Sequence, residues 1–250
     1  MATVFKNLLS NDVATTRTLL NEAIPITGSI VSGTYMDANI KNYAHEMFQS
    51  VYDYPYLSSS ANHIFDISYG YTTGSSSDVQ HEKKMNIYNQ MAQVLVGYSP
   101  AGNIRKFDQD GSFTGGTKHK DCVFINYSRL LVKDEIKKGS YTLTVNSGSS
   151  QITLADHGAQ NDYRVNSPTG EYGILYTSSL ASPGTGVGLV YYQAGVAVIT
   201  ASSDIFESGS SYAATFNITG AADDVRRVWE NNELNNTTEL NSTIYFCRAN

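Results

Sequence analysis

The chain has 250 residues, of which 41% are hydrophobic and only 16% are charged, and its formal net charge at pH 7 is −6. A disordered chain carries high charge and few aromatic residues, so this composition excludes general disorder and predicts one large folded domain or two small ones. The acidic balance, with basic residues only in short runs beside Asp or Glu, argues against nucleic acid as a direct partner.

Membrane association and secretion are not expected either. No stretch approaches the roughly 18 apolar residues of a membrane span, and residues 1–9 lack the pattern of a signal peptide. We therefore expect a protein made in a cytoplasm. The two cysteines, Cys122 and Cys247, lie in apolar runs typical of buried free thiols, with a single disulfide as the open alternative.

The first third of the chain predicts an extended segment followed by a helix. Residues 1–35 look extended, with a strand at 24–31 where β-branched residues alternate. Asp37 is a plausible helix N-cap, and Tyr54-Pro55 would end that helix. Its apolar stripe would consist of residues at three- and four-residue spacing, namely Ile40, Ala44, Met47, Phe48 and Val51.

A strand and a second helix follow. Residues 63–71 alternate aromatic or apolar residues with small or polar ones, which predicts a strand. Asp78 can cap the next helix, and Gly97 is a natural C-terminal stop. The buried stripe of this helix would be Val79, Met85, Tyr88, Met91 and Leu95.

The rest of the chain is rich in short strands. A polar loop at 105–120 precedes a buried strand within 121–131 and a short turn at 133–138. From residue 140, strand-like segments separated by Gly, Ser, Asn and Pro predict an antiparallel β region. These segments are 141–145, 151–155, 173–177, 187–192 and 194–200, the last two forming either one strand bent at Gly195 or a hairpin.

The chain closes with a third helix at 221–230, with Val225, Val228 and Trp229 inward, and a strand at 242–247. Because it stops at Asn250 without a turn, we expect either a truncated sequence or an edge that a partner completes. The expected fold is α+β, with two or three amphipathic helices packed on a mainly antiparallel sheet. Residues 1–139 would form an α+β part and residues 140–250 a β-rich part, or the two would be one continuous domain.

The motifs in the sequence predict no enzyme, no cofactor and no catalytic or metal-binding residue. The five histidines show no zinc-type spacing. Cys122 follows His119 by three residues but opens an apolar strand beside Asp121. The glycines from Gly184 precede a strand rather than a helix, so they do not predict a phosphate loop. Asp108 begins a run with a hint of a calcium loop, but a turn is the better interpretation.

Tyrosine, with 18 copies, is the most informative residue type. Ordinary packing explains many of them, but Tyr is also favoured at protein interfaces, where it provides contact area at low entropic cost. The candidate interface residues are Tyr52, Tyr54, Tyr56, Tyr69, Tyr71 and Tyr245. Exposed tyrosines would also suit carbohydrate binding.

Several long stretches resemble virion structural proteins of marine contractile-tailed phages, notably those of cyanobacteria. They are Phe48-Gln-Ser-Val-Tyr-Asp-Tyr-Pro-Tyr-Leu, Ala61-Asn-His-Ile-Phe-Asp-Ile-Ser-Tyr-Gly-Tyr, Asn86-Ile-Tyr-Asn-Gln-Met-Ala-Gln-Val-Leu-Val-Gly, and the segments 124–140 and 235–248. The resemblance covers most of the chain and brings no catalytic residue with it.

The resemblance implies a tail, baseplate or neck component that assembles in the host cytoplasm and resides in the virion. Its partners would be other virion proteins and further copies of itself. The alternative is a receptor-binding tail module that recognises host glycans through Tyr and Asn loops. A glycan-degrading tail enzyme is a third possibility, for which no pair of carboxylates stands out.

Overall fold

Strands dominate the computed structural model, which describes residues 7–32, 38–148, 150–177, 185–202 and 204–247. The helices are α1 (Gly28–Val31), α2 (His81–Leu95), α3 (Arg129–Val132) and α4 (Ile218–Val228), with 3-10 turns at Ser10–Asp12 and Gly209–Ser211. The strands are β1 (Val13–Thr27), β2 (Ile40–Asn42), β3 (Gln49–Tyr52), β4 (His63–Tyr71), β5 (Phe107–Asp108), β6 (Lys118–His119), β7 (Asp121–Tyr127), β8 (Glu135–Ile136), β9 (Thr142–Ser147), β10 (Ser150–Ala155), β11 (Arg164–Ser167), β12 (Gly170–Tyr176), β13 (Gly186–Tyr191), β14 (Val196–Thr200) and β15 (Trp229–Tyr245).

One 13-stranded sheet organises the molecule, in the order β1-β15-β9-β10-β12-β13-β14-β7-β4-β3-β2, with β8 and β11 attached beside it. The named strands pair antiparallel throughout, which confirms the expected mainly antiparallel sheet. The sheet runs across residue 139, because β14 pairs with β7 and β15 pairs with β1. The two expected parts of the chain therefore share one sheet.

Both faces of the sheet are buried in the body of the molecule. Along β7, Val123 and Ile125 belong to one apolar cluster, whereas Phe124 belongs to another. The first cluster includes residues of α4 and the second includes residues of α2. Phe65 of β4 stacks on Trp229 of β15, with 5.1 Å between ring centroids. Since these two strands are distant in the sheet order, the sheet must fold back on itself around the first cluster.

Helix α2 follows the sequence prediction closely. Tyr88 and Leu95 are buried, and Gly97 ends the helix with φ of +79° while its N–H donates to the carbonyl of Ala92. The expected cap is wrong, since the residue before the helix is Gln80 in the left-handed region. Asp78 instead accepts hydrogen bonds from the Ser75 N–H and the Tyr71 hydroxyl, so it shapes the preceding turn.

One member of the expected stripe on α2 lies outside the helix, and one buried residue of α2 was not expected. Val79 precedes the helix and is 42% exposed. Lys84 is fully buried, and its ammonium donates to the carbonyls of Tyr212, Ala213 and Phe216 at 2.9, 2.7 and 2.7 Å. Burial lowers the pKa of Lys84 to about 8, which leaves the group mostly protonated at neutral pH. This cation ties α2 to the segment that leads into α4.

The helix expected after Asp37 does not form, and Asp37 itself lies outside the described residues. The chain makes β2 and β3 there, with Ile40 directly opposite Val51 in an antiparallel pair. The apolar spacing that predicted one helical stripe also suits two short strands that each place an apolar residue on the same face. The pairing of β3 with β4 favours the two strands over the helix, because it buries Val51 in the core.

Other boundaries moved for local reasons. Helix α4 starts at Ile218, where the Asn217 side chain accepts from the Gly220 N–H at 2.7 Å, and Trp229 begins β15 rather than ending the helix. Gly195 has φ of +69° and forms a hairpin between β13 and β14, which selects one of the two alternatives. The strand expected at 24–31 ends at Thr27 and continues as α1.

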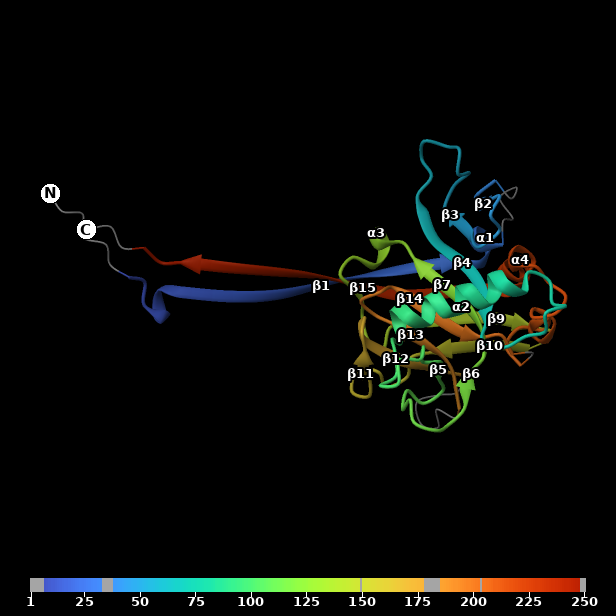
Figure 1. The fold of residues 1–250 in the computed structure, drawn as a ribbon. Helices are drawn as coiled ribbons and strands as arrows, with labels where there is room; N and C mark the ends of the chain where they lie inside the picture. The colour runs from blue at the N-terminus through green and yellow to red at the C-terminus, as the bar shows by residue number, and fades with distance from the viewer. Residues whose placement is uncertain (1–6, 33–37, 149, 178–184, 203, 248–250) are drawn as a thin grey trace.

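The last strand differs most from expectation. Instead of occupying 242–247 alone, β15 spans Trp229–Tyr245 and pairs along its length with β1, from Thr27 opposite Asn231 to Val13 opposite Tyr245. Figure 1 shows the blue and red strands leaving the body together as a long two-stranded ribbon. Cys122 is buried in β7 and Cys247 lies exposed beyond β15, so the alternative of a disulfide between them is wrong.

Candidate functional site

The most unusual feature of the molecule is the outer half of the β1–β15 ribbon, residues 13–20 and 238–245, which we call the arm. Leu20 pairs with Thr238 at its base and Val13 with Tyr245 at its end. At about 3.3 Å per residue the arm is roughly 25 Å long. Figure 1 shows it projecting clear of the body. An isolated two-stranded ribbon is only marginally stable in water, so an arm of this length calls for a stabilising contact.

The two faces of the arm differ in charge, because directly opposed residues of an antiparallel pair point to the same side. One side, the uncharged face, carries Ala14, Thr16, Thr18, Leu20, Thr238, Leu240, Ser242 and Ile244. The other side, the charged face, carries Val13, Thr15, Arg17, Leu19, Glu239, Asn241, Thr243 and Tyr245. Arg17 and Glu239 form an ion pair there, which lowers the pKa of the Glu239 carboxyl.

The uncharged face is the outward continuation of a core face. Further along the same side of the ribbon lie Leu234 and Ile26, which are 1% and 2% exposed in the main apolar cluster. Asn236 marks the transition, since its side-chain amide donates to the carbonyl of Leu131 in α3 at 2.8 Å. Inside the body this side of the ribbon is therefore covered, and along the arm it is open.

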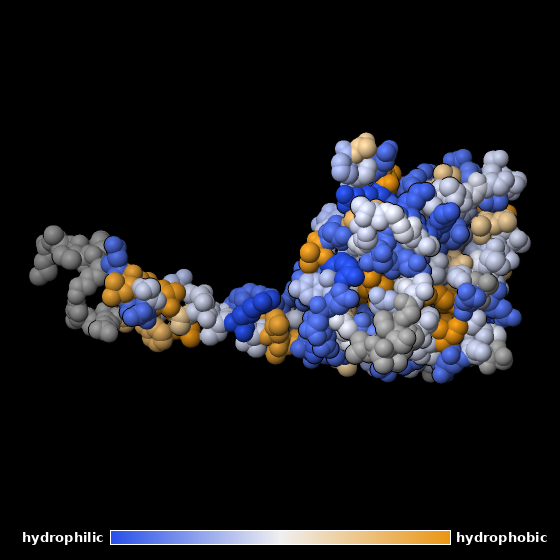
Figure 2. All heavy atoms as spheres, turned by 90° about the horizontal axis from the view of Figure 1, so that it is seen from below, coloured by the Kyte–Doolittle hydropathy of each residue, from blue (hydrophilic) through white to orange (hydrophobic). Residues whose placement is uncertain are grey.

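Large aliphatic side chains stand in solvent on this open face. Leu20 is 52% exposed, Leu240 is 47% exposed and Ile244 is 49% exposed. Figure 2 shows hydrophobic residues toward the outer end of the ribbon and again near the body, with hydrophilic residues between them. Removing apolar area from water stabilises a contact by about 25 cal/mol per Å², and exposed apolar patches typically mark interaction sites. The arm is thus suited to binding another surface.

The arm also offers unpaired backbone groups. β1 is the outermost strand of the sheet along its whole length. The free edge of β15 is covered by the segment after α3 only as far as Glu239, whose N–H donates to the Asp134 carboxylate at 2.8 Å. Long exposed edges are a hazard for a monomer, because any chain with a free edge can pair with them. In an assembly the same groups can hold a neighbour.

The predicted interface tyrosines are separated by the fold. Tyr245 lies at the end of the arm and is 59% exposed, and Tyr54 and Tyr56, between β3 and β4, are 58% and 37% exposed. Tyr52 is half-buried. The prediction is wrong for Tyr69 and Tyr71, which are 1% and 0% exposed. Their rings pack in the core near the Lys84 ammonium, because this face of β4 points inward.

Sequence reasoning missed the aliphatic residues of the arm. Leu19, Leu20 and Leu240 look like ordinary strand residues when each segment is taken alone. The signal that could have revealed the uncharged face is the alternation in both segments, where every second residue is aliphatic or a small hydroxyl residue. Reading it requires knowing that Val13–Thr27 pairs with Trp229–Tyr245.

The cysteine–histidine candidate does not form an activated pair. The Cys122 thiol lies 3.8 Å from the backbone carbonyl of His119, not from its imidazole. Burial raises the pKa of the Cys122 thiol well above its usual value and lowers the pKa of His119 to about 4. Both shifts favour the neutral forms, so these two groups do not make a thiolate–imidazolium nucleophile.

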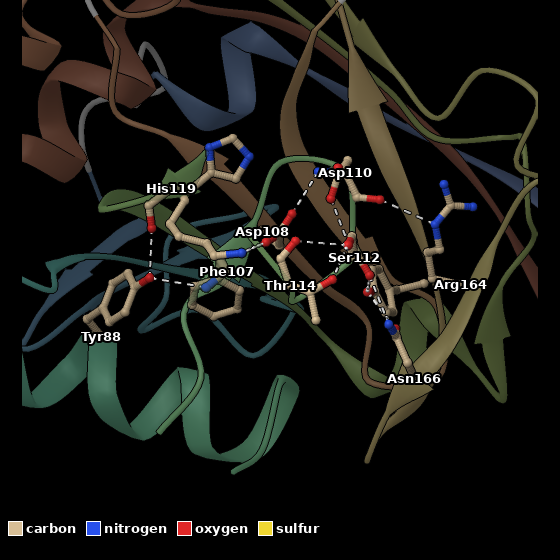
Figure 3. A network of polar contacts seen from close by, with 12 residues as sticks. Tyr88, Phe107, Asp108, Asp110, Ser112, Thr114, His119, Arg164 and Asn166 are labelled. Carbon is tan, nitrogen blue, oxygen red and sulfur yellow. Dashed lines mark hydrogen bonds and ion pairs between the residues drawn. The ribbon is translucent and has the colours of Figure 1, made fainter. Parts of the chain in front are cut away.

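The candidate calcium loop is a turn held by hydrogen bonds within the loop and by contacts with Arg164 and Asn166, as Figure 3 shows. Asp108 accepts from the Asp110 N–H at 3.1 Å and forms an ion pair with Lys118, and Asp110 accepts from the Ser112 N–H at 2.8 Å. Tyr88 anchors the loop to α2 by donating to the His119 carbonyl at 2.7 Å. The carboxylates thus bind their own loop, which favours the turn interpretation. The phosphate-loop candidate begins at Gly184, outside the described residues.

A polar cleft of about 750 Å³ lies beside this loop, where β6, β10 and the start of β13 meet. Its walls are mainly hydroxyl and amide side chains, among them Gln109, Gln151, Thr153 and Thr200. His119 lines it as well, and its Nε2 has no hydrogen-bond partner within the described chain. Among the described residues no Phe, Tyr or Trp side chain lines this cleft, so they provide no platform of the kind on which sugars usually stack.

Among the residues with assigned positions, no three His, Cys, Asp or Glu side chains gather in a metal-binding group. No helix within the described ranges is long and apolar enough to cross a membrane. Comparisons with protein-family models, with curated proteins and with solved structures found no match.

Proposed function

We propose that this chain is a structural protein of a contractile-tailed phage particle, assembling in multiple copies in the tail, baseplate or neck through protein–protein contacts. The sequence resemblance supplies the type of particle, and the arm supplies a physical reason for assembly. In this proposal the chain works in the virion, with other virion proteins and its own copies as partners, and acts without catalysis or cofactor.

One observation carries the proposal: the arm extends the core-facing side of the sheet into solvent. Leu20, Leu240 and Ile244 are each about half exposed there. A chain that acted alone would gain by covering these side chains or replacing them with charged ones. In a particle they are buried by a neighbour. The body, held by one continuous sheet with α2 and α4 packed as amphipathic helices, would be the rigid base for this arm.

Mass spectrometry of purified phage particles tests the proposal directly. We expect the chain to be present at a fixed ratio to other tail proteins and to stay with tails when heads are removed. Cryo-electron microscopy of the same particles should place the arm against protein density. Absence of the chain from particles, with its presence in the infected cell, would overturn the proposal.

The glycan-recognising alternative has one feature in its favour, the exposed aromatic pair Tyr54 and Tyr56 on the β3–β4 connection. The ring of Tyr56 packs against that of Tyr52, with 6.2 Å between ring centroids and 41° between ring planes, so these two rings are tilted and do not form one flat platform. A glycan array would distinguish the functions: saturable binding that is lost in Tyr54→Ala would favour recognition of a host receptor.

A further inference from the structure

We infer that the uncharged face of the arm docks on the same face of a second copy of this chain, with the two arms antiparallel about a two-fold axis. This inference rests on the proposed function, because it names the partner of the arm. It commits to a homotypic contact instead of one with a different virion protein. Charge, shape and position along the ribbon support it.

Charge makes the face compatible with itself. No Asp, Glu, Lys or Arg occurs on the uncharged face between Ala14 and Leu20 or between Thr238 and Ile244, and the next β1 residue on this side is Glu22, opposite Asn236 at the base of the arm. Two identical surfaces that carried charge would place like charges together, which costs free energy. The ion pair of Arg17 with Glu239 lies on the opposite side of the arm and stays in solvent in this arrangement.

Shape makes the face complementary to itself. An axis that crosses the face between the Thr18–Leu240 pair and the Thr16–Ser242 pair places each large residue opposite a smaller one. Leu20 then opposes Ala14 of the second copy, Leu240 opposes Ser242, and Ile244 opposes Thr238. Large residues set against small ones let two faces interdigitate without voids.

The base and the end of the arm favour the antiparallel orientation. Helix α3 lies at the base on this side, where Asn236 donates to its Leu131 carbonyl, and the neighbouring Leu130 is 74% exposed. The end of the arm carries Leu9 and Phe246, which are 69% and 56% exposed. Antiparallel arms bring the end of one copy toward α3 of the other. Parallel arms would bring the two α3 helices together and hold the faces apart.

The surface area buried between the two arms sets the expected affinity of the dimer. A face roughly 25 Å long and about 10 Å wide gives about 250 Å² per chain, or about 500 Å² for two arms. A stable interface buries at least about 1,000 Å², so the contacts between arm ends and α3 are needed as well. We therefore expect a concentration-dependent dimer with Kd of roughly micromolar magnitude, which many copies in one particle would strengthen.

Sedimentation velocity of the full chain, with two adjacent substitutions, tests the partner. Leu20→Lys places an ammonium on the uncharged face and should raise Kd at least about tenfold, because the charge would have to be desolvated. Leu19→Lys is the matched control: Leu19 is 49% exposed, against 52% for Leu20, but lies on the charged face opposite Glu239. It should leave Kd unchanged. Equal effects of the two variants, a monomer at about 100 µM, or a trimer would overturn the inference.

Distance measurement at Cys247 tests the orientation. Cys247 is exposed near the end of the arm and Cys122 is buried, so a thiol-specific spin label modifies the former. Six residues separate it from the proposed axis at Asn241, so antiparallel arms place two labels about 40 Å apart. Parallel arms would place them within roughly 20 Å, and that result would overturn the arrangement. A monomeric chain that is nonetheless found in particles would defeat this inference alone, whereas a dimer absent from particles would defeat the proposed function alone.

Discussion

The indole ring of Trp229 stacks on the phenyl ring of Phe65, with 5.1 Å between centroids and 15° between planes. Trp229 is the first residue of β15, and Phe65 belongs to β4 near the opposite edge of the sheet. The stack therefore closes the sheet around the main apolar cluster. It also fixes the point from which β15 runs out toward the arm.

Trp229→Ala should lower the free energy of unfolding by about 3–5 kcal/mol, the usual cost of removing a large buried aromatic side chain. Trp229→Phe should cost clearly less, roughly 1–2 kcal/mol. The phenylalanine keeps a stacking ring, and the buried indole N–H it removes has no acceptor in the described chain. Urea denaturation monitored by circular dichroism measures both. Equal losses in the two variants would contradict the role of the stack.

Lys84→Met should lower the free energy of unfolding by about 2–4 kcal/mol, because it leaves one buried and two partly buried carbonyls without this donor. The matched control is Lys83→Met one residue earlier, where the side chain is 45% exposed and the ion pair with Glu46 is 3.7 Å long. That change should stay within about 0.5 kcal/mol. Thermal unfolding of both variants at the same pH measures this difference. Equal shifts in Tm for the two variants would refute the stabilising role of the buried Lys84 ammonium.

Asp156 should make stability depend on pH. Burial raises the pKa of its carboxyl to about 6, although the N–H groups of Gly139 and Tyr141 and the Tyr192 hydroxyl donate to it. Since the folded pKa lies above the unfolded value of 3.8, the folded state binds more protons between pH about 4 and 6. The contribution of this group is therefore full below pH about 4 and is lost as pH rises through 6, by roughly 3 kcal/mol in total.

The measurement is a series of urea unfolding curves between pH 4 and 7. Asp156→Asn should remove this fall in the free energy of unfolding, whereas Asp162→Asn, at a carboxylate 70% exposed, should keep it. A wild-type pH profile identical to that of Asp156→Asn would show that Asp156 titrates normally in the folded protein.

Hydrogen exchange should divide the ribbon into two parts. In dilute protein, peptides covering 13–20 and 238–245 should exchange much faster than those covering β4 and β7, because the arm is exposed and has no core beneath it. Raising the protein concentration should slow exchange in the arm of the wild type and not in that of Leu20→Lys. An arm that is fully protected in the monomer would contradict its description as an uncovered ribbon.

Several elements could be predicted from the sequence because their signals are local. The strands β4, β9, β10 and β12 to β14 show strand-like segments bounded by turn residues, and α2 keeps a helical apolar period over His81–Leu95, whereas the short strand β11 was not expected from the sequence. The prediction of a helix between Ile40 and Val51 was wrong because the same apolar spacing fits one helix or two strands. Only the neighbouring strand β4 supplies the hydrogen bonds that favour β3.

The sequence by itself determined that the chain folds and that its sheet is mainly antiparallel. The alternation in the segments 13–20 and 238–245 acquires a meaning only once the two segments are seen to pair. Only the tertiary structure decided that these two segments pair, that their shared uncharged face continues the core, and that the ribbon leaves the body. The physical reason is separation along the chain: Arg17 and Glu239 are 222 residues apart, and local propensity carries no information about which distant strand completes a given edge.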